Sequence, residues 1–482
     1  LVTLCMQHIM SFSVKHEVPA PREQVWQWHA RRGALARLTP PFTFITPLNQ
    51  AESLADGTSI LGLPGGLKWV ARHDLSRFQI NVSFSDVCLN APMRSWATWR
   101  HHHLFADTDA DANDIGAATQ ITDTVDTRIP SWAVNSVFAY RQHQLIEDFQ
   151  FLNRMRELGI HATAPAVDSS SNVRPLVFAI TGSRGGVGRK LTAQLTTAGH
   201  QVIQLVRNSP KPGQRQWRPN LPAPNLLEGV DVLIHLAGEP IFGRFNAAHK
   251  ADIRDSRVRP TQLLAEVAGA TPELKAMVCA SAIGIYGADQ GDTELTEESS
   301  RGDGFLADVV SDWEAACTPA REAGKRVVNV RTGIALSSNS GLLPLLRALF
   351  STGLGGAFGR GEFWYSWVAM DDLTDIYFRA AVDSQLVGPV NATSPTPVLN
   401  KEFVHALGEE LKRPAMVPIP TFGPALLLGK EGASELALAN QKVIPARLNK
   451  LGHTFRYSTV AAALAHELGG EELWTPATRA AD

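Results

Sequence analysis

The sequence predicts two units: an N-terminal α+β domain and a C-terminal α/β domain with a doubly wound parallel sheet. Three observations carry this prediction. A short apolar stretch, Leu176–Ile180, runs directly into a glycine-rich turn. Beyond it, apolar strands alternate with helical patterns, an order that is typical of a parallel sheet covered by helices on both faces. Before it, several alternating strand patterns precede one long helical pattern, which indicates antiparallel strands and an α+β domain.

The glycine-rich turn is the most informative motif. Gly182, Gly185 and Gly188 have the spacing G-x-x-G-x-x-G, and a helical pattern begins at Arg189. Glycine lets the backbone approach a pyrophosphate, which then lies on free N–H groups at the positive end of the helix. An ordinary strand–turn–helix is the alternative, but the flanking elements favour a Rossmann-type dinucleotide site. The predicted contacts of this loop are Gly182, Ser183, Arg184, Gly185, Val187 and Gly188.

The residue after the second strand indicates which dinucleotide binds. The strand Gln201–Val206 ends in Arg207, where an Asp or Glu would accept hydrogen bonds from a free ribose 2′-hydroxyl. A guanidinium favours a 2′-phosphate, through charge-assisted and often bidentate hydrogen bonds, and Arg184 is a candidate second partner. Two solvated surface arginines are the alternative. We therefore expect NADP(H) rather than NAD(H).

Composition excludes several classes of protein. The chain has 482 residues, enough for two or three domains, and a formal net charge of −2, which implies no general attraction to nucleic acid or anionic membranes. Its four cysteines lack C-x-x-C spacing and indicate free thiols in a reducing compartment. No apolar run reaches the roughly 18 residues of a membrane span, and the segment Leu1–Met10 lacks the pattern of a signal peptide. We expect a cytoplasmic location.

The boundary between the two domains is predicted at a small, polar segment without periodicity, Thr163–Asn172. It divides the chain into residues 1–165 and 173–482. The later strands of the second domain are expected at Asp231–Gly238, Met277–Ser281 and Arg326–Val330. In the first domain, strands are expected at Phe12–Val18, Phe78–Phe84, Ser95–Phe105 and Thr119–Val125, and helices at Pro21–Leu38 and Trp132–Leu158.

Three consecutive histidines, His101, His102 and His103, lie in one of the N-terminal strand patterns. Strand periodicity places His101 and His103 on one face and His102 on the other. The sequence shows no third ligand beside this pair, so buried or surface histidines are the favoured interpretation and no metal is expected.

From Val173 onward the chain resembles the extended short-chain dehydrogenase/reductases, in their atypical nucleoside-diphosphate-sugar epimerase-like branch. The resemblance implies that Leu236, Ala237 and Glu239 lie along the cofactor and that Trp217 lies near the adenine. The matching motifs run the length of the domain: Thr181–Gly188, His235–Ile241, Ile253–Arg257, Ser281–Gly287, Arg331–Gly333 and Trp367–Leu373.

The chemistry of that family normally uses Ser, Tyr and Lys, with the last two in Y-x-x-x-K. Ser281 stands at the family's serine position, but Phe305 and Val309 stand where Tyr and Lys are expected, and neither can ionise. Tyr286 follows closely after Ser281 and is the candidate substitute donor, with a packing role as the alternative. The predicted catalytic residues are therefore Ser281 and Tyr286, and the sequence leaves open whether the protein turns over a substrate.

Residues 11–160 resemble the START-like, polyketide cyclase-like superfamily of lipid- and polyketide-binding domains. The match rests on the opening Val18–Trp26, the order of strands and the long closing helix. This resemblance implies a sheet bent around the helix and an apolar cavity, for which the candidate lining residues are Trp69, Trp96, Trp99 and Phe138. Core packing is the alternative for each of them.

Two functions follow from these observations. The first is an NADP(H)-dependent epimerase or oxidoreductase acting on a small hydrophobic or sugar-like ligand, held in the N-terminal cavity. The second is a non-catalytic, NADP(H)-dependent binding or regulatory protein, favoured by the missing Tyr and Lys. Some relatives are named cell-division inhibitors, a name to which these residues give no physical basis. A homo-oligomer is compatible with the sequence, which does not determine the substrate.

Overall fold

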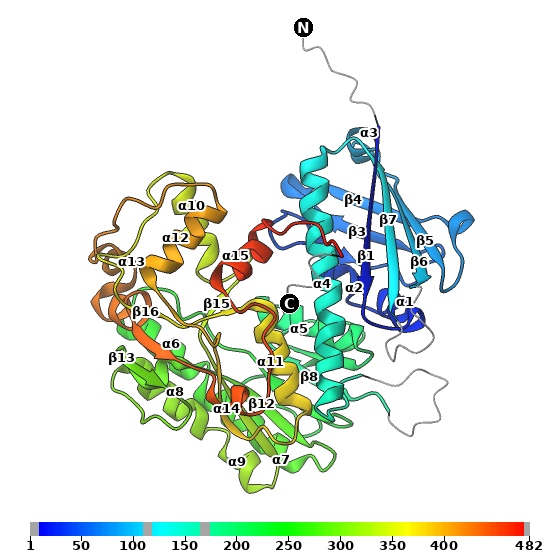
Figure 1. The fold of residues 1–482 in the computed structure, drawn as a ribbon. Coiled ribbons are helices and arrows are strands. Elements are labelled where there is room, and N and C mark those ends of the chain that lie inside the picture. Colours follow the sequence, from blue (N-terminus) through cyan, green and yellow to red (C-terminus); the bar gives the residue numbers. More distant parts are fainter. Residues whose placement is uncertain (1–8, 109–117, 164–173, 477–482) are drawn as a thin grey trace.

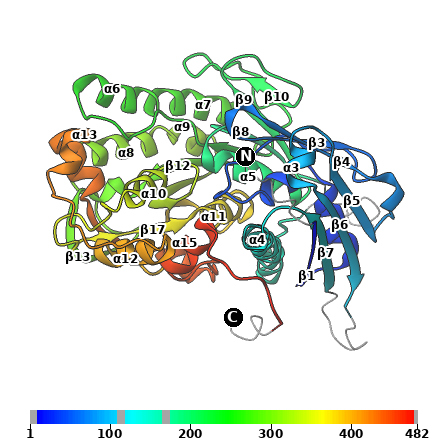
Figure 2. The same ribbon diagram turned by 90° about the horizontal axis from the view of Figure 1, so that it is seen from above.

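The computed structural model describes residues 9–108, 118–163 and 174–476. The chain forms an antiparallel sheet, a parallel sheet with helices on both faces, and a smaller C-terminal region beside it (Figure 1). The long helix α4 stands between the antiparallel sheet and the rest of the molecule in both views (Figures 1 and 2). The predicted boundary segment Thr163–Asn172 lies, except for Thr163, outside the described residues, as do most of Leu1–Met10 and the cysteine Cys5.

The N-terminal sheet has seven antiparallel strands in the order β1-β7-β6-β5-β4-β3-β2. Its inward face packs on α4 and α1, because alternate residues of β6 and β7 are buried. The strands are β1 (Met10–Val18), β2 (Thr46–Asn49), β3 (Thr58–Gly62), β4 (Lys68–His73), β5 (Ser83–Cys88), β6 (Arg100–Asp107) and β7 (Thr119–Thr127); the helices are α1 (Arg22–Ala30), α2 (Ala34–Arg37), α3 (Met93–Ala97) and α4 (Ser131–Glu157).

The second sheet is parallel throughout, in the order β10-β9-β8-β11-β12-β14-β18. From β8 the chain first adds β9 and β10 on one side, and it then adds β11, β12, β14 and β18 on the other side. The strand order therefore reverses between β8 and β11. Ligands of doubly wound folds bind at such a reversal. The strands are β8 (Val177–Thr181), β9 (Gln201–Val206), β10 (Gln214–Gln216), β11 (Val232–His235), β12 (Ala276–Ala282), β14 (Arg326–Thr332) and β18 (Gly388–Ala392).

Two apolar layers cover this sheet. One contains buried residues of α5 and α11, and the other contains those of α7, α8 and α9. The helices are α5 (Gly186–Thr197), α6 (Ala247–Asp255), α7 (Val258–Ala270), α8 (Phe305–Ala315), α9 (Thr318–Glu322) and α11 (Met370–Val382). Among the described residues, no helix combines the length and the apolar character that crossing a membrane requires.

The C-terminal region extends the carboxyl edge of the parallel sheet. It has its own apolar core, formed mainly by α10, α12 and α15 around Trp367. Its elements are β13 (Asp289–Leu295), β15 (Ile334–Leu336), β16 (Trp364–Tyr365), β17 (Trp367–Ala369), β19 (Val398–Leu399), β20 (Asn440–Val443), α10 (Leu343–Ser351), α12 (Asn400–Glu410), α13 (Gly423–Gly432), α14 (Ala446–Lys450) and α15 (Val460–Leu468).

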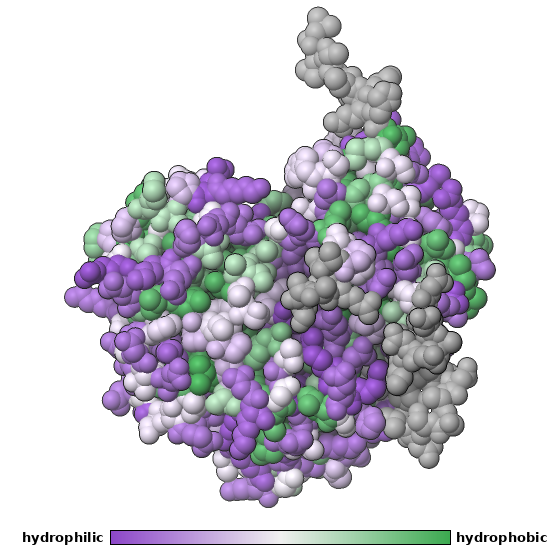
Figure 3. All heavy atoms as spheres, in the orientation of Figure 1, coloured by the Kyte–Doolittle hydropathy of each residue, from purple (hydrophilic) through white to green (hydrophobic). Residues whose placement is uncertain are grey.

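The last part of α4 belongs to the core of the parallel sheet. Phe151, Leu152 and Met155 are buried in the same cluster as Phe178 of β8 and Phe378 of α11, and the rings of Phe151 and Phe378 are 5.6 Å apart. The N-terminal unit therefore completes one helical layer of its neighbour. On the face seen in Figure 3, hydrophilic and hydrophobic side chains are interspersed, and a notch separates the N-terminal sheet from the lobe that contains α10 and α12.

Most predicted elements are confirmed, and β9 matches its predicted strand residue for residue. Phe78–Phe84 is wrong as a strand: the chain turns there through Asn81, at φ +59°, and β5 begins only at Ser83. Pro21–Leu38 is not one helix: α1 ends at Ala30 with Arg31 extended, and α2 begins after Gly33, whose φ is +101°. Ser95–Phe105 is wrong at its start, because Ser95–Ala97 lie in α3 and β6 begins only at Arg100. Asn81, Gly33 and Thr98 each have a positive φ near these interruptions, and apolar periodicity does not reveal a single residue in that conformation.

Candidate functional site

The glycine loop lies where the strand order reverses. Gly182 follows β8 at φ +66°, and a Cβ atom there would lie 2.8 Å from the carbonyl carbon of Leu236, which follows β11. Thr181 ties the two strand ends together, because its Oγ1 accepts hydrogen bonds from the backbone N–H groups of Leu236 and Ala237 at 3.0 and 3.2 Å. The close approach therefore requires glycine at position 182.

The helix α5 begins inside this loop. Its N-cap is Gly185, and a Cβ atom on Gly188 would lie 2.7 Å from the Cα of Ser183. The first N–H groups of a helix have no partner within the helix and carry its positive end. The start of α5 thus offers backbone N–H groups with the polarity that a pyrophosphate requires.

The remaining predicted cofactor residues lie around this cradle in different environments. Arg184, Arg207 and Glu239 are exposed, whereas Ser183 is buried and Val187, Leu236 and Ala237 are half-buried. Trp217 is only 3% exposed and packs against His235 in the core, with ring centroids 5.6 Å apart. Because the protein encloses this ring, little of it is left for the expected contact with an adenine.

A pocket of about 180 Å³ opens at the carboxyl ends of β12 and β14. One wall is the apolar face of α8, with Leu306, Val309, Val310 and Trp313, and another is Arg257 at the start of α7. The C-terminal region closes the pocket with Glu435 and Gln441. Glu435 also accepts the backbone N–H groups of Phe305 and Leu306 at 3.0 and 2.7 Å, so it caps α8 from another part of the chain.

Ser281 and Tyr286 meet in one buried polar network behind this pocket. Ser281 Oγ donates to Glu314 at 2.6 Å, and Arg331 holds the same carboxylate with two hydrogen bonds of 2.9 Å. Arg331 also donates to the hydroxyl of Tyr286 at 3.0 Å, and that hydroxyl donates to Asn391 at 2.7 Å. Sequence reasoning missed Glu314, Arg331 and Asn391 because they come from three separate elements.

This network limits what the two predicted catalytic residues can do. Tyr286 is fully buried, and burial raises the pKa of its phenol. Neither Ser281 nor Tyr286 is among the described residues that line the pocket. Val309 does line it, at the position of the expected lysine, and the Phe305 ring lies 4.6 Å from the ammonium of Lys250. No ionisable side chain of α8 is therefore among the pocket residues of the described chain.

Arg257 and Glu435 are the charged residues among those that line the pocket, and Arg257 is the cationic one. It is 6% exposed and donates to the carbonyl oxygens of Ile253 and Glu239 at 3.1 and 2.9 Å. Its guanidinium lies 5.1 Å from the Trp313 ring, and its buried Nε has no hydrogen-bond partner among the described residues. Burial lowers the pKa of Arg257 to about 10. The sequence motif Ile253–Arg257 contained this residue, but nothing local marked it as part of a pocket.

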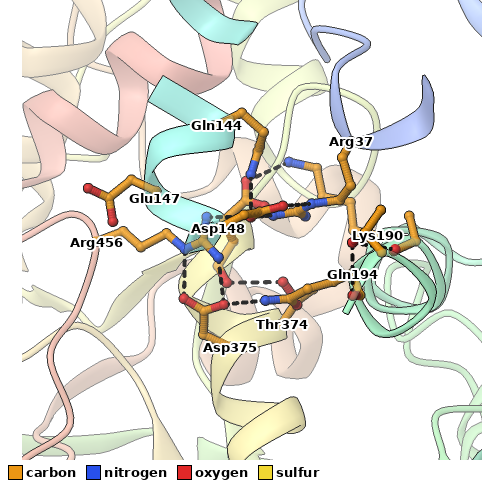
Figure 4. Close-up of polar contacts among 12 residues, drawn as sticks. Arg37, Gln144, Glu147, Asp148, Lys190, Gln194, Thr374, Asp375 and Arg456 are labelled. Atoms are coloured by element: carbon orange, nitrogen blue, oxygen red, sulfur yellow. Dashed lines mark hydrogen bonds and ion pairs between the residues drawn. The ribbon is translucent and has the colours of Figure 1, made fainter. Parts of the chain in front are cut away.

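At the start of α11, Asp371 joins the two units, whereas Asp372 holds the segment at Arg456 and Tyr457. Asp371 pairs with Arg37 of α2 at 2.7 Å and with Lys190 of α5 at 2.8 Å. Asp372 accepts the backbone N–H of Arg456 at 2.6 Å, and burial together with Asp375 raises its pKa to about 8. Figure 4 shows the neighbouring contacts, in which Arg456 bridges Asp148 of α4 and Asp375.

The fold and the loop define a protein of the Rossmann class with an epimerase-like extension at the carboxyl edge. A family model described as the NAD dependent epimerase/dehydratase family matches residues 178–391, and a domain of unknown function, DUF1731, matches residues 419–467. An epimerase family protein of Mycobacterium bovis is 38% identical over 294 residues, which cover 60% of this chain and 97% of that protein. The chain belongs to the NAD dependent epimerase/dehydratase family.

Two solved structures extend the comparison. A nucleoside-diphosphate sugar epimerase from Corynebacterium glutamicum is 51% identical, covers 98% of this chain and 92% of its own, and has a TM-score of 0.83. This likeness includes the N-terminal unit. The human epimerase family protein SDR39U1, solved with NADPH, is 30% identical, covers 61% of this chain and 99% of its own, and has a TM-score of 0.56.

Proposed function

We propose that this protein binds NADP(H) on the glycine loop and holds a small anionic, sugar-like ligand in the adjoining pocket. The free N–H groups at the start of α5, on the loop that follows Gly182, support a bound pyrophosphate. Arg207 and Arg184, both exposed, are suited to a ribose 2′-phosphate. NADPH is bound in the human relative, and the Corynebacterium protein is described as a nucleoside-diphosphate sugar epimerase, which supports this ligand class.

The observation that carries the ligand class is Arg257. Its guanidinium is buried in the pocket wall and donates to the carbonyl oxygens of Ile253 and Glu239 and to Ser256 Oγ. The exposed Glu239 acts on it electrostatically, but among the described residues no carboxylate forms a salt bridge with it. A buried charge is costly unless it is paired. A carboxylate or phosphate of a bound ligand would supply that pair, while the apolar face of α8 would contact the rest of the ligand.

A bound nicotinamide would exchange a hydride with a carbonyl or hydroxyl group of the ligand. The residues of this chain would orient the ligand and exclude water through Val309, Val310 and Trp313. They supply no Tyr–Lys proton relay, because Phe305 and Val309 occupy its positions. We therefore expect slow turnover, in which a proton comes from water or from the ligand. A non-catalytic NADP(H)-binding protein is the second candidate, favoured by the burial of Tyr286 between Arg331 and Asn391.

The test measures binding of small carboxylates, sugar phosphates and nucleoside-diphosphate sugars to the NADPH-loaded protein by calorimetry. Arg257→Gln is expected to weaken anionic ligands at least tenfold and to leave NADPH binding nearly unchanged. Arg254→Gln is the matched control, since Arg254 is half-exposed and pairs with Asp312 on the surface. Anionic ligands that bind both variants equally would remove Arg257 from the site. Bound NADPH that no carbonyl compound oxidises would favour the second candidate.

For the N-terminal unit we propose a START-like ligand-binding module, with the domain division at residues 1–165 and 173–482. The seven-stranded antiparallel sheet and the closing helix α4 support this proposal. The four expected cavity residues are not alike, because Phe138 is fully buried whereas Trp96 is 65% exposed. A cleft of about 1040 Å³ between the units, lined by Phe44, Leu48 and Gly186, is the better candidate for passing a ligand toward the glycine loop.

A further inference from the structure

Four polar side chains meet on the buried face of the N-terminal sheet, away from the glycine loop. They come from three adjacent strands: Asp86 from β5, His101 and His103 from β6, and Asp123 from β7. Strand pairing places Asp86 opposite His101 and Asp123 opposite His103. The register of the sheet therefore brings these side chains together. The sequence alone could not show that a carboxylate lies beside the histidine pair.

Asp123 holds both imidazoles by one nitrogen each. Its Oδ1 lies 2.9 Å from His101 Nε2 and 2.7 Å from His103 Nδ1. Each imidazole has one more nitrogen, which does not contact Asp123. These are His101 Nδ1, which lies 3.5 Å from Asp86 Oδ2, and His103 Nε2. Donor atoms at about 2.0–2.1 Å from a tetrahedral zinc ion are themselves about 3.4 Å apart. The separation of His101 Nδ1 and Asp86 Oδ2 thus suits two ligands of one metal ion.

One possible ligand atom each from Asp86, His101 and His103 lies within 4.8 Å of the others. A second observation comes from His16 of β1, which is 3% exposed and whose two ring nitrogens have no hydrogen-bond partner among the described residues. His16 pairs with Ile121 in the sheet, two residues from Asp123 on the same buried face of β7, and His16 and Asp123 interact electrostatically. A buried imidazole without a hydrogen-bond partner calls for an explanation, and an ion bound near it is one.

The charges of the cluster also leave room for a cation. Asp86 and Asp123 are two largely buried carboxylates, and the half-buried Arg141 of α4 supplies one positive charge that acts on both. The two carboxylates outnumber this guanidinium, so a cation at the cluster would meet a net negative charge. Histidine nitrogens and a carboxylate are donors that zinc and its neighbours in the first transition series prefer.

We propose that Asp86, His101 and His103 bind one divalent transition-metal ion of the zinc class, and that Asp123 positions the two imidazoles. Three protein ligands leave a fourth place in a tetrahedral site for water or for a small ligand, as in zinc sites that act on substrates. The carboxylate of Asp123 fixes which nitrogen of each imidazole faces the metal, a role that outer partners of metal-binding histidines commonly have. The N-terminal unit would then be a metal-dependent module.

The experiment uses the full-length protein without an affinity tag, stripped with a chelator and titrated with Zn²⁺ or Co²⁺. We expect one ion per chain, and a visible Co²⁺ spectrum of a nitrogen- and oxygen-ligated site. Asp86→Asn and His101→Ala should each weaken binding at least tenfold. Asp123→Asn should weaken it by about 10–100-fold, the usual effect of losing an outer partner.

His102→Ala is the matched control, because His102 points to the other face of β6 and bonds Ser85 at 2.7 Å. Circular dichroism checks that each variant is folded. If His101→Ala does not fold, Asp86→Asn, at a partly exposed position, tests whether the cluster binds the metal ion. Absence of stoichiometric binding to the unmodified protein would overturn the proposal. So would equal losses of affinity in Asp86→Asn and His102→Ala.

Discussion

Arg37 of the N-terminal unit and Asp371 of α11 form an ion pair of 2.7 Å in which each side chain is 1% exposed. Arg37 also pairs with Asp148 of α4, and Asp371 also pairs with Lys190 of α5, the helix that begins in the glycine loop. The same region contains Arg456, which is 2.9 Å from Asp148 (Figure 4). One buried ionic network therefore joins the N-terminal unit, the cofactor-loop helix and α11.

The first prediction concerns this network. Arg37→Ala would leave Asp148 and Asp371 buried with one cation fewer, and removing one partner of a buried pair typically costs about 3–5 kcal/mol. We expect a loss of that size in the free energy of unfolding, measured by urea denaturation. Arg32→Ala is the control, because the Arg32 side chain is 85% exposed and should contribute no more than about 1 kcal/mol. Equal effects of the two variants would contradict the prediction.

The second prediction concerns the choice of cofactor. Arg207→Ala should weaken NADPH by about 1.5–3 kcal/mol, the value of a hydrogen bond to a charged group, and leave NADH nearly unchanged. Calorimetric titration with both dinucleotides measures the difference. The exposed Arg218→Ala serves as a control for the loss of a surface charge. Tighter binding of NADH than NADPH by the unmodified protein would show that Arg207 does not contact a 2′-phosphate.

The third prediction concerns Ser281 and Tyr286. Ser281→Ala should reduce whatever oxidation of NADPH the protein supports, since the resemblance to the family implies a catalytic serine at this position. Tyr286→Phe should lower stability by about 1–3 kcal/mol, because Asn391 and Arg331 lose a buried partner, and should leave turnover nearly unchanged. A rate that falls sharply in Tyr286→Phe while the folded state persists would make Tyr286 the proton donor after all.

The fourth prediction concerns pH. Burial alone would lower the pKa of His466, but Glu471 and Asp371 raise it to about 9. A histidine whose pKa is higher in the folded state stabilises the protein fully below its unfolded pKa of 6.5, and this contribution is lost as the pH rises through 9. We expect the free energy of unfolding to fall by up to about 3 kcal/mol across this window, at roughly 1.4 kcal/mol per pKa unit.

Asp372 also makes the protein less stable as the pH rises. The pKa of its carboxyl is raised in the folded state, so the free energy of unfolding falls as the pH rises toward 8. His466→Gln separates the two contributions. Its unfolding free energy should change less between pH 6.5 and 9 than that of the unmodified protein, whereas His405→Gln, at an exposed position of α12, should keep the original slope. The same slope in both variants would mean that His466 is not charged in the folded protein.

Local patterns were enough for much of the fold and for the cofactor loop. The glycines of the loop, the strand Gln201–Val206 and the long helix α4 depend on chain neighbours a few residues apart, so their signals are visible along the sequence. The alternation that placed His101 and His103 on one buried face is of the same kind. The turn at Asn81 was missed because one left-handed residue leaves the apolar pattern unchanged.

The sequence by itself thus determined the parallel sheet, the glycine-rich turn between β8 and α5 and the absence of a Tyr–Lys pair on α8. Only the tertiary structure decided which charges meet. Arg37 and Asp371 are 334 residues apart in the chain, and Asp86 reaches His101 only through the register of β5 and β6. Burial makes each of these charges require a partner, but which partner it finds depends on packing between distant elements, and no local periodicity records that choice.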